Sequence, residues 1–232
     1  MPASPERPLV AVLDVNETLT DMSPLSARLE RVGAPGHLLA PWFAGVLRDG
    51  IALAAAGAFA PFAELAAAGL RGLLSAQPGL DRTPEEAAEF VLGGLVELPL
   101  HPDIRPGISA LRDAGLRVIA LTNGGGRTAR QVLTRGGVAE LLEDVLSVEE
   151  PRRWKPAPES YLYAARRCDV APGRMMLIAV HPWDIDGARR AGLRAAWINR
   201  TGAPYPEPLL GPELEAESLP DLAAALASAG LS

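Results

Sequence analysis

Short apolar runs alternate with helix-like segments over most of the second half of the chain. The runs span residues 117–121, 144–148, 175–180 and 194–198, and another run, residues 9–13, stands near the N-terminus. Between and after them we expect helices over residues 108–114, 127–135, 159–167, 185–190 and 220–227. Short apolar runs are typical of strands buried on both faces, and strands that alternate with helices form parallel sheets. The sequence therefore predicts an α/β fold with a parallel sheet.

Residues 20–100 have a different character, because they are rich in alanine and leucine and contain no strand pattern. The predicted helices of this part are residues 24–32, 41–57, 58–76 and 84–98. Ser23 is expected to cap the first helix with its side chain, and Thr83 with Glu86 predicts a capping box at the last. We therefore expect a core domain of residues 1–19 and 101–232, interrupted by an all-helical domain of residues 20–100.

Composition narrows the possible partners and the compartment. The chain has 22 basic and 28 acidic residues, a net charge of −6, and no basic run, so nucleic acid is not an expected partner. Its single cysteine, Cys168, cannot form an internal disulfide, which fits a reducing compartment. No apolar signal core precedes residue 9, and no stretch suggests an uninterrupted membrane span. We therefore expect a cytoplasmic protein without a membrane partner.

Polar side chains follow the predicted strands where the strands end. They are Asp14, Thr122, Asn123, Lys155, His181 and Asp184. The carboxyl ends of parallel strands share one edge of a sheet, and ligands bind at that edge. Taken singly, Asp14 could cap a turn, Lys155 could be an exposed loop lysine and Asn123 a turn residue. The whole set favours an active site with Asp14 as the candidate nucleophile.

In this order the motifs resemble those of the haloacid dehalogenase superfamily. They are the stretch from Asp14 to Thr18, the pair Thr122-Asn123, the pair Lys155-Pro156, and the acidic stretch around Asp184. The resemblance implies a Rossmann-like core, and the helical insertion looks like the superfamily's cap domain.

Within the superfamily, the chain looks most like the (S)-2-haloacid dehalogenases, also called type II. Asn16 stands where phosphatases have a second aspartate, Tyr161 follows Lys155 at the dehalogenase spacing, and residues 197–202 are also similar. The resemblance implies hydrolysis of a small halogenated carboxylic acid to a 2-hydroxy acid and halide, without a cofactor. The residues themselves favour a metal-free site, because Val180 replaces an aspartate that would ligate Mg²⁺.

The resemblance also implies roles for these residues. Asp14 would form an ester with the substrate, Lys155 would orient it, and Asp184 would act on the hydrolytic water. Thr18 would brace the loop that follows the nucleophile. The expected remaining contacts, to Asp14 or to the substrate, involve Asn16, Thr122, Asn123 and Tyr161.

The sequence departs from the dehalogenase pattern at three places. Phe43 follows Trp42 where the family has an arginine that grips halide and substrate, and phenylalanine cannot bind an anion in that way. Asn16 and Glu17 stand where the family has tyrosine and glycine. His181 replaces an asparagine, close to Trp183. We expect Trp42 and Phe43 to form an apolar wall, and His181 to donate a hydrogen bond to halide or carboxylate.

Two other functions stay open at this point. One is a small-molecule phosphatase, which would depend on magnesium. The other is a non-catalytic protein that binds a small acid or a protein partner. Phe43 in place of the family arginine favours this alternative. Members of the family are often dimers, so a homodimer through the alanine-rich helices is a further expectation.

Overall fold

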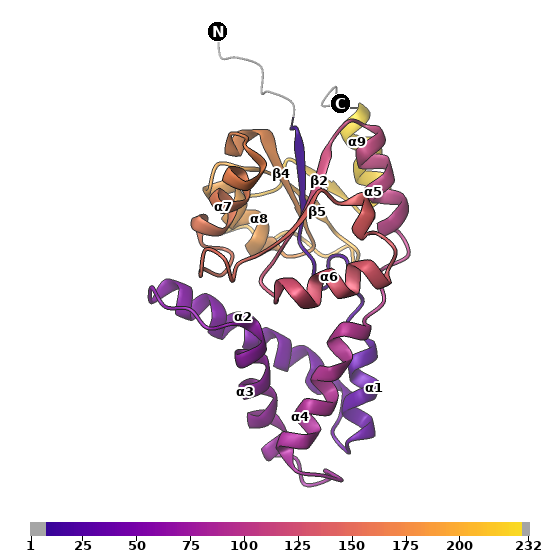
Figure 1. The fold of residues 1–232 in the computed structure, drawn as a ribbon, viewed down its shortest axis with the longest axis vertical. Coiled ribbons are helices and arrows are strands. Elements are labelled where there is room, and N and C mark those ends of the chain that lie inside the picture. Colours follow the sequence, from indigo (N-terminus) through magenta and orange to yellow (C-terminus); the bar gives the residue numbers. More distant parts are fainter. Residues whose placement is uncertain (1–7, 229–232) are drawn as a thin grey trace.

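The computed structural model describes residues 8–228 and contains a six-stranded sheet (Figure 1). The strand order is β3-β2-β1-β4-β5-β6, and all neighbouring strands run parallel. The strands are β1 (Val10–Leu13), β2 (Arg117–Thr122), β3 (Asp144–Ser147), β4 (Met175–Ala179), β5 (Arg194–Ile198) and β6 (Leu214–Ala216). The predicted parallel α/β sheet is confirmed.

Helices cover both faces of the sheet, so the core domain has three layers (Figure 1). On one face, where Ala11 and Leu13 point, lie α5 (Ile104–Asp113), α6 (Gly126–Arg135) and α9 (Leu219–Ser228). On the other, where Val10 and Val12 point, lie α7 (Pro158–Cys168) and α8 (Pro182–Arg190). Since β1 is covered on both sides, all of its residues are apolar and buried.

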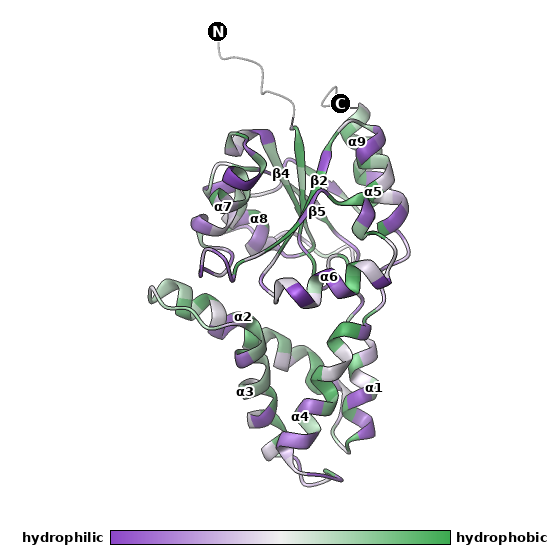
Figure 2. Ribbon diagram, in the orientation of Figure 1, coloured by the Kyte–Doolittle hydropathy of each residue, from purple (hydrophilic) through white to green (hydrophobic). Residues whose placement is uncertain are grey.

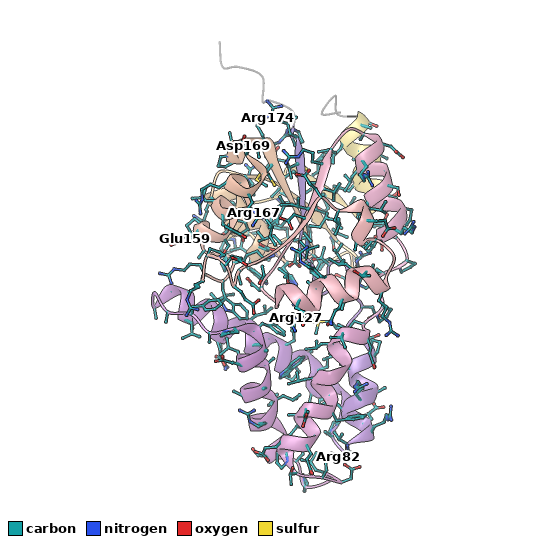
Figure 3. All side chains as sticks on the ribbon, in the orientation of Figure 1. Arg82, Arg127, Glu159, Arg167, Asp169 and Arg174 are labelled. Carbon is teal, nitrogen blue, oxygen red and sulfur yellow. The ribbon has the colours of Figure 1, made fainter. Side chains whose placement is uncertain are left out.

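The inserted segment forms a separate helical body, the cap, below the sheet in Figure 1. Its helices are α1 (Pro24–Arg31), α2 (Leu39–Ala55), α3 (Phe62–Ser75) and α4 (Pro84–Leu92). They share their own cluster of buried apolar side chains, and Figure 2 shows hydrophobic residues along α2 and along the central strands. Figure 3 places Arg82 at the end of the cap farthest from the sheet, so the molecule is elongated.

Several helix ends differ from the prediction. Ser23 does precede the first helical residue, but its hydroxyl bonds to Asp21 instead of capping α1, so that part of the prediction is wrong. The capping box of Thr83 and Glu86 is confirmed. The helix that it starts ends at Leu92 and continues as a 3₁₀ turn over Gly93–Glu97, because adjacent glycines disfavour a regular α-helix.

The other differences come from prolines and from one short strand. α3 begins at Phe62 rather than residue 58, because Pro61 keeps extended backbone at the N-cap. α5 begins at Ile104 rather than residue 108, since Pro106 falls in the first turn, where a helix needs no N–H. Strand β6 was not predicted, because none of its three residues is fully buried, Glu215 is exposed, and the strand follows a proline-rich loop.

One cap helix also differs from the expectation that no stretch is apolar enough to span a membrane. The segment Gly36–Ala55 has sufficient length and hydropathy for a span, although only 22% of its most apolar window is buried. In the fold, Trp42, Phe43 and Val46 of this segment belong to the apolar cluster of the cap. One side of the segment therefore packs into the cap, while most of its residues are partly or fully exposed.

Candidate active site

The centre of the site is Lys155, whose side chain is fully buried. Its ammonium donates to Asp14 Oδ1 at 2.8 Å, to Asp184 Oδ2 at 2.7 Å and to the Leu121 carbonyl at 3.0 Å. All three donors of the ammonium are therefore used. The sheet topology thus brings Asp14, Lys155 and Asp184 together from three distant parts of the sequence, at the predicted edge of the sheet.

Asp14 follows β1 directly and is almost completely buried. Its second oxygen, Oδ2, accepts a 2.6 Å hydrogen bond from Thr18, whose hydroxyl in turn accepts from the Val180 backbone N–H at 3.1 Å. Burial alone would raise the pKa of Asp14, but the positive charge of Lys155, with further help from His181 and the two hydrogen bonds, lowers it below its usual value. Asp14 is thus held as a carboxylate, as a nucleophile requires.

Asp184 lies at the start of α8 and is fully buried. Tyr161 donates a 2.6 Å hydrogen bond to its Oδ1, while Lys155 occupies Oδ2. Burial raises the pKa of Asp184, and the pair with Lys155 only partly offsets this. The two carboxylates that share one ammonium thus differ in basicity, and Asp184 is the more basic of the two.

Thr122 and Asn123 end β2 at the same edge, but their contacts differ from those expected. The Asn123 amide accepts from the Lys155 backbone N–H at 2.8 Å and donates to the Lys155 carbonyl at 3.2 Å. The Thr122 hydroxyl accepts from the Gly124 N–H at 2.8 Å. Asn123 therefore fixes the loop that carries Lys155 instead of bonding to Asp14.

His181 stands at the mouth of the site, between the two domains. Its Nε2 lies 3.2 Å from the Asn16 carbonyl and 3.8 Å from Asp14 Oδ2. The imidazole stacks on Trp183 with ring centroids 5.1 Å apart, and Phe43 of the cap approaches it to 6.5 Å. The structure thus brings His181, Trp183 and Phe43 together beside the nucleophile.

Trp42 is the predicted site residue that turns away from this group. Its side chain is buried in the cap, and its indole N–H donates to the Ala66 carbonyl at 2.9 Å. It contacts the site through its neighbour Phe43, with ring centroids 6.3 Å apart.

Two residues near the site were not among the predicted site residues. Glu17 has a left-handed backbone, with φ of 62°, and its Oε2 lies 3.5 Å from His181 Nε2. Trp154, next to Lys155, is buried in the cap, where its indole N–H donates to the Ala60 carbonyl and its ring stacks on Phe62. An acidic residue three positions after Asp14 and an aromatic residue before Lys155 were the available signals.

The residues of this site do not fit Mg²⁺, the metal that phosphatases of this fold use. One oxygen of Asp14 and one of Asp184 are already paired with the Lys155 ammonium. Val180 offers no ligating side chain, and Asn16 carries no charge. Over residues 8–228, no group of three or more His, Cys, Asp or Glu residues could hold a metal ion.

Comparison with known proteins assigns the chain to a family. The family model of haloacid dehalogenase-like hydrolases matches residues 9–192, which include Asp14, Lys155 and Asp184. The chain belongs to this family. One similar member is (S)-2-haloacid dehalogenase 1 of Pseudomonas sp. (strain CBS-3), which is 32% identical over 64% of this chain and 64% of its own length. Another is haloacetate dehalogenase H-2 of Moraxella sp. (strain B), which is 32% identical over 48% of this chain and 50% of its own length. This chain thus matches less than two thirds of either relative.

Solved structures extend the similarity to nearly the whole fold of this family member. The crystal structure of an L-2-haloacid dehalogenase superposes with a TM-score of 0.85 at 25% identity, covering 97% of this chain and 100% of the other. The cap is included in this coverage. The predicted Rossmann-like core with an inserted helical cap is therefore confirmed.

Proposed function

We propose that the chain is a hydrolytic, metal-independent dehalogenase that converts a small 2-haloalkanoic acid to the 2-hydroxy acid and halide. The observation that carries the proposal is the buried Lys155 ammonium between Asp14 and Asp184. It holds Asp14 ionised, as a nucleophile requires, while Val180 offers no carboxylate to ligate Mg²⁺. A halide leaving group also needs no general acid, which agrees with Asn16 in place of the phosphatase aspartate.

In the first step, a carboxylate oxygen of Asp14 attacks the carbon that bears the halogen. A carbon–oxygen bond forms, the carbon–halogen bond breaks, and halide leaves with the bonding electron pair. Thr18 and Lys155 fix the two oxygens of the nucleophile by hydrogen bonds of 2.6 and 2.8 Å. Such fixation lowers the barrier by keeping the attacking group in a productive orientation.

In the second step, water attacks the carbonyl carbon of the aspartyl ester, the bond from this carbon to the substrate oxygen breaks, and the departing alkoxide takes up a proton to leave as the 2-hydroxy acid. Asp184 takes the proton of this water, since burial makes it the more basic carboxylate. Tyr161 and Lys155 hold Asp184 by one hydrogen bond on each oxygen. Tyr161 acts through Asp184 and is a positioning residue in this scheme.

In this scheme, His181 partly replaces the family arginine in binding the halide. Its Nε2 lies 3.8 Å from Asp14 Oδ2, close enough to the nucleophile to reach a departing halide once its contact with the Asn16 carbonyl is exchanged. Phe43 and Trp183 flank its ring, and apolar walls strengthen a hydrogen bond to an anion. His181→Ala should therefore reduce turnover and weaken halide inhibition, and a variant with both unchanged would reject this role.

The decisive experiment is halide release from fluoroacetate, chloroacetate and (S)-2-chloropropionate in the presence of EDTA, with Asp14→Asn as the matched inactive variant. Release that survives EDTA and disappears in Asp14→Asn supports the proposal. No release from any of these acids contradicts it. A screen of phosphate esters with magnesium would then test the phosphatase function, and affinity for unhalogenated acids would test the binding protein.

We also propose that the enzyme works in the cytoplasm as a homodimer. The free, buried Cys168 is compatible with a reducing compartment. Ala40, Ala44 and Ala52 lie exposed on α2, and small apolar side chains allow close packing of a second helix. A monomeric mass in light scattering at micromolar concentration would contradict the dimer.

A further inference from the structure

The site has one side that is apolar and uncharged. A cavity of about 220 Å³ lies between the cap and α6. The cap contributes Phe62, Ala66, Leu95 and Leu98, and α6 contributes Ala129 and Val132. None of the residues that line this cavity, which we call the apolar chamber, carries a charge.

The chamber meets the active site at its polar end. Asn16 and Thr122 line it there; Asn16 belongs to the loop that follows Asp14, and Thr122 ends β2 just before Asn123, which fixes Lys155. Their side chains converge on Gly124: a Cβ atom at Gly124 would lie 3.1 Å from Thr122 Oγ1 and 3.5 Å from Asn16 Nδ2. The chamber thus has hydrogen-bonding groups at one end and hydrocarbon walls beyond them.

A second cavity, which adjoins the chamber at Thr20, has a different character. The second cavity, on the side of His181, is lined by the charged side chains of Glu17, Asp21 and Arg200. Burying hydrocarbon beside such groups is unfavourable, because they would lose water without gaining hydrogen bonds. The uncharged chamber is therefore the more favourable of the two cavities for an apolar part of a substrate.

We propose that the apolar chamber is a subsite for the alkyl substituent of the substrate, so that the enzyme takes 2-substituted acids with several carbons beyond C2. This inference rests on the proposed function and deepens it by naming the substrate class. A liquid water molecule occupies about 30 Å³, so the chamber has room for several heavy atoms beyond a halogen or a methyl group. Each methylene buried there should improve binding about three- to fourfold.

The test compares short and long acids in two independent measurements. Calorimetry measures the affinity of the unhalogenated products, 2-hydroxypropionate and 2-hydroxyhexanoate. Halide release measures kcat/KM for (S)-2-chloropropionate and (S)-2-chlorohexanoate. We expect the six-carbon acid to be favoured at least about tenfold in both measurements, since three methylenes are added.

Variants then locate the effect. Ala63→Leu fills the chamber from the cap, and Thr128→Leu fills it from α6, so each should abolish most of the preference for the longer acid. Ala68→Leu is the matched control, since Ala68 is an exposed residue of the same helix α3 and does not line the chamber. Circular dichroism checks that all three variants fold.

The outcomes separate the two proposals. Equal affinity for the short and long products, or a preference that survives both filling variants, overturns the alkyl subsite. Chain-length-dependent binding without any halide release keeps the subsite and overturns the dehalogenase function. Halide release without a dependence on chain length keeps the dehalogenase function and overturns the alkyl subsite.

Discussion

The hydroxyl of Tyr161 donates a 2.6 Å hydrogen bond to Asp184 Oδ1, while Lys155 binds the other oxygen of the same carboxylate. Both oxygens of Asp184 are therefore fixed by hydrogen bonds, and the carboxylate can change its protonation state without changing its position. The hydrogen bond favours the ionised form and so moderates the upward pKa shift that burial causes.

Tyr161→Phe removes this hydrogen bond and should raise the pKa of Asp184 further. If Asp184 accepts the proton of the hydrolytic water, the acidic limb of the kcat profile moves to higher pH, with a fall in kcat of about tenfold or more. Tyr163→Phe is the matched control, because the Tyr163 hydroxyl accepts a hydrogen bond from Arg167 at 3.4 Å and not one from the site residues described above. An acidic limb that stays in place would contradict the role of Asp184 as base.

Lys155→Gln leaves Asp14 and Asp184 buried without their shared cation. We expect a loss of about 3–5 kcal/mol in the free energy of unfolding, because an unpaired buried charge is costly. Activity should fall at least about a hundredfold to a thousandfold, since Asp14 then binds a proton more tightly. Urea denaturation and halide release at several pH values measure both effects. Full activity in Lys155→Gln would remove the basis of the proposed mechanism.

The stability of the fold at high pH depends on Lys155 and Tyr161. The charges of Asp14 and Asp184 outweigh the effect of burial and raise the pKa of Lys155 above 10.5, while burial and the neighbouring Asp184 raise the pKa of Tyr161 well above 10.0. In both cases the folded state binds the proton more tightly than the unfolded chain. Their contribution is complete below about pH 10 and is lost as the pH rises further. Urea unfolding between pH 8 and pH 11 should show this decline, and Tyr161→Phe should make it shallower.

The sequence predicted the chemistry of the site better than its geometry. Asp14, Lys155 and Asp184 follow from the rule that parallel strands deliver their end residues to one edge, and this rule needs no knowledge of side-chain contacts. The hydrogen bonds between Asn123 and the Lys155 backbone could not be predicted, because they depend on how two loops of separate crossovers meet.

The fold was predictable where local patterns are strong. Buried strands and the Thr83 capping box carry their signal within a few residues. Strand β6 carries none, because its pairing with β5 depends on a neighbour that is distant in the sequence. The insertion of Trp154 into the cap is likewise a tertiary contact, which an aromatic residue beside a motif suggests only after the fold is known.

This insertion leads to a prediction on two glycines of α2. A Cβ atom at Gly50 would lie 2.3 Å from the Trp154 ring, whereas one at Gly45 would meet nothing within 4 Å. Gly50→Ala should therefore destabilise the protein by about 1–3 kcal/mol through overpacking. Gly45→Ala should stabilise it by about 0.5–1 kcal/mol through helix propensity. Thermal unfolding of both variants measures these effects. Equal shifts of the melting temperature would contradict the close contact between α2 and Trp154.

Glu17 combines backbone strain with an unfavourable charge. Its φ of 62° costs a residue with a side chain about 1–2 kcal/mol, and its carboxylate, 3.5 Å from His181 Nε2, adds a negative charge beside a site that binds an anionic substrate. Glu17→Gly should remove both costs, whereas Glu17→Gln removes only the charge. We therefore expect both variants to lower KM for a haloacid, most clearly at low salt, and only Glu17→Gly to raise the melting temperature. If KM rises in both variants, Glu17 acts instead by holding His181, 3.5 Å away, in its position beside Asp14.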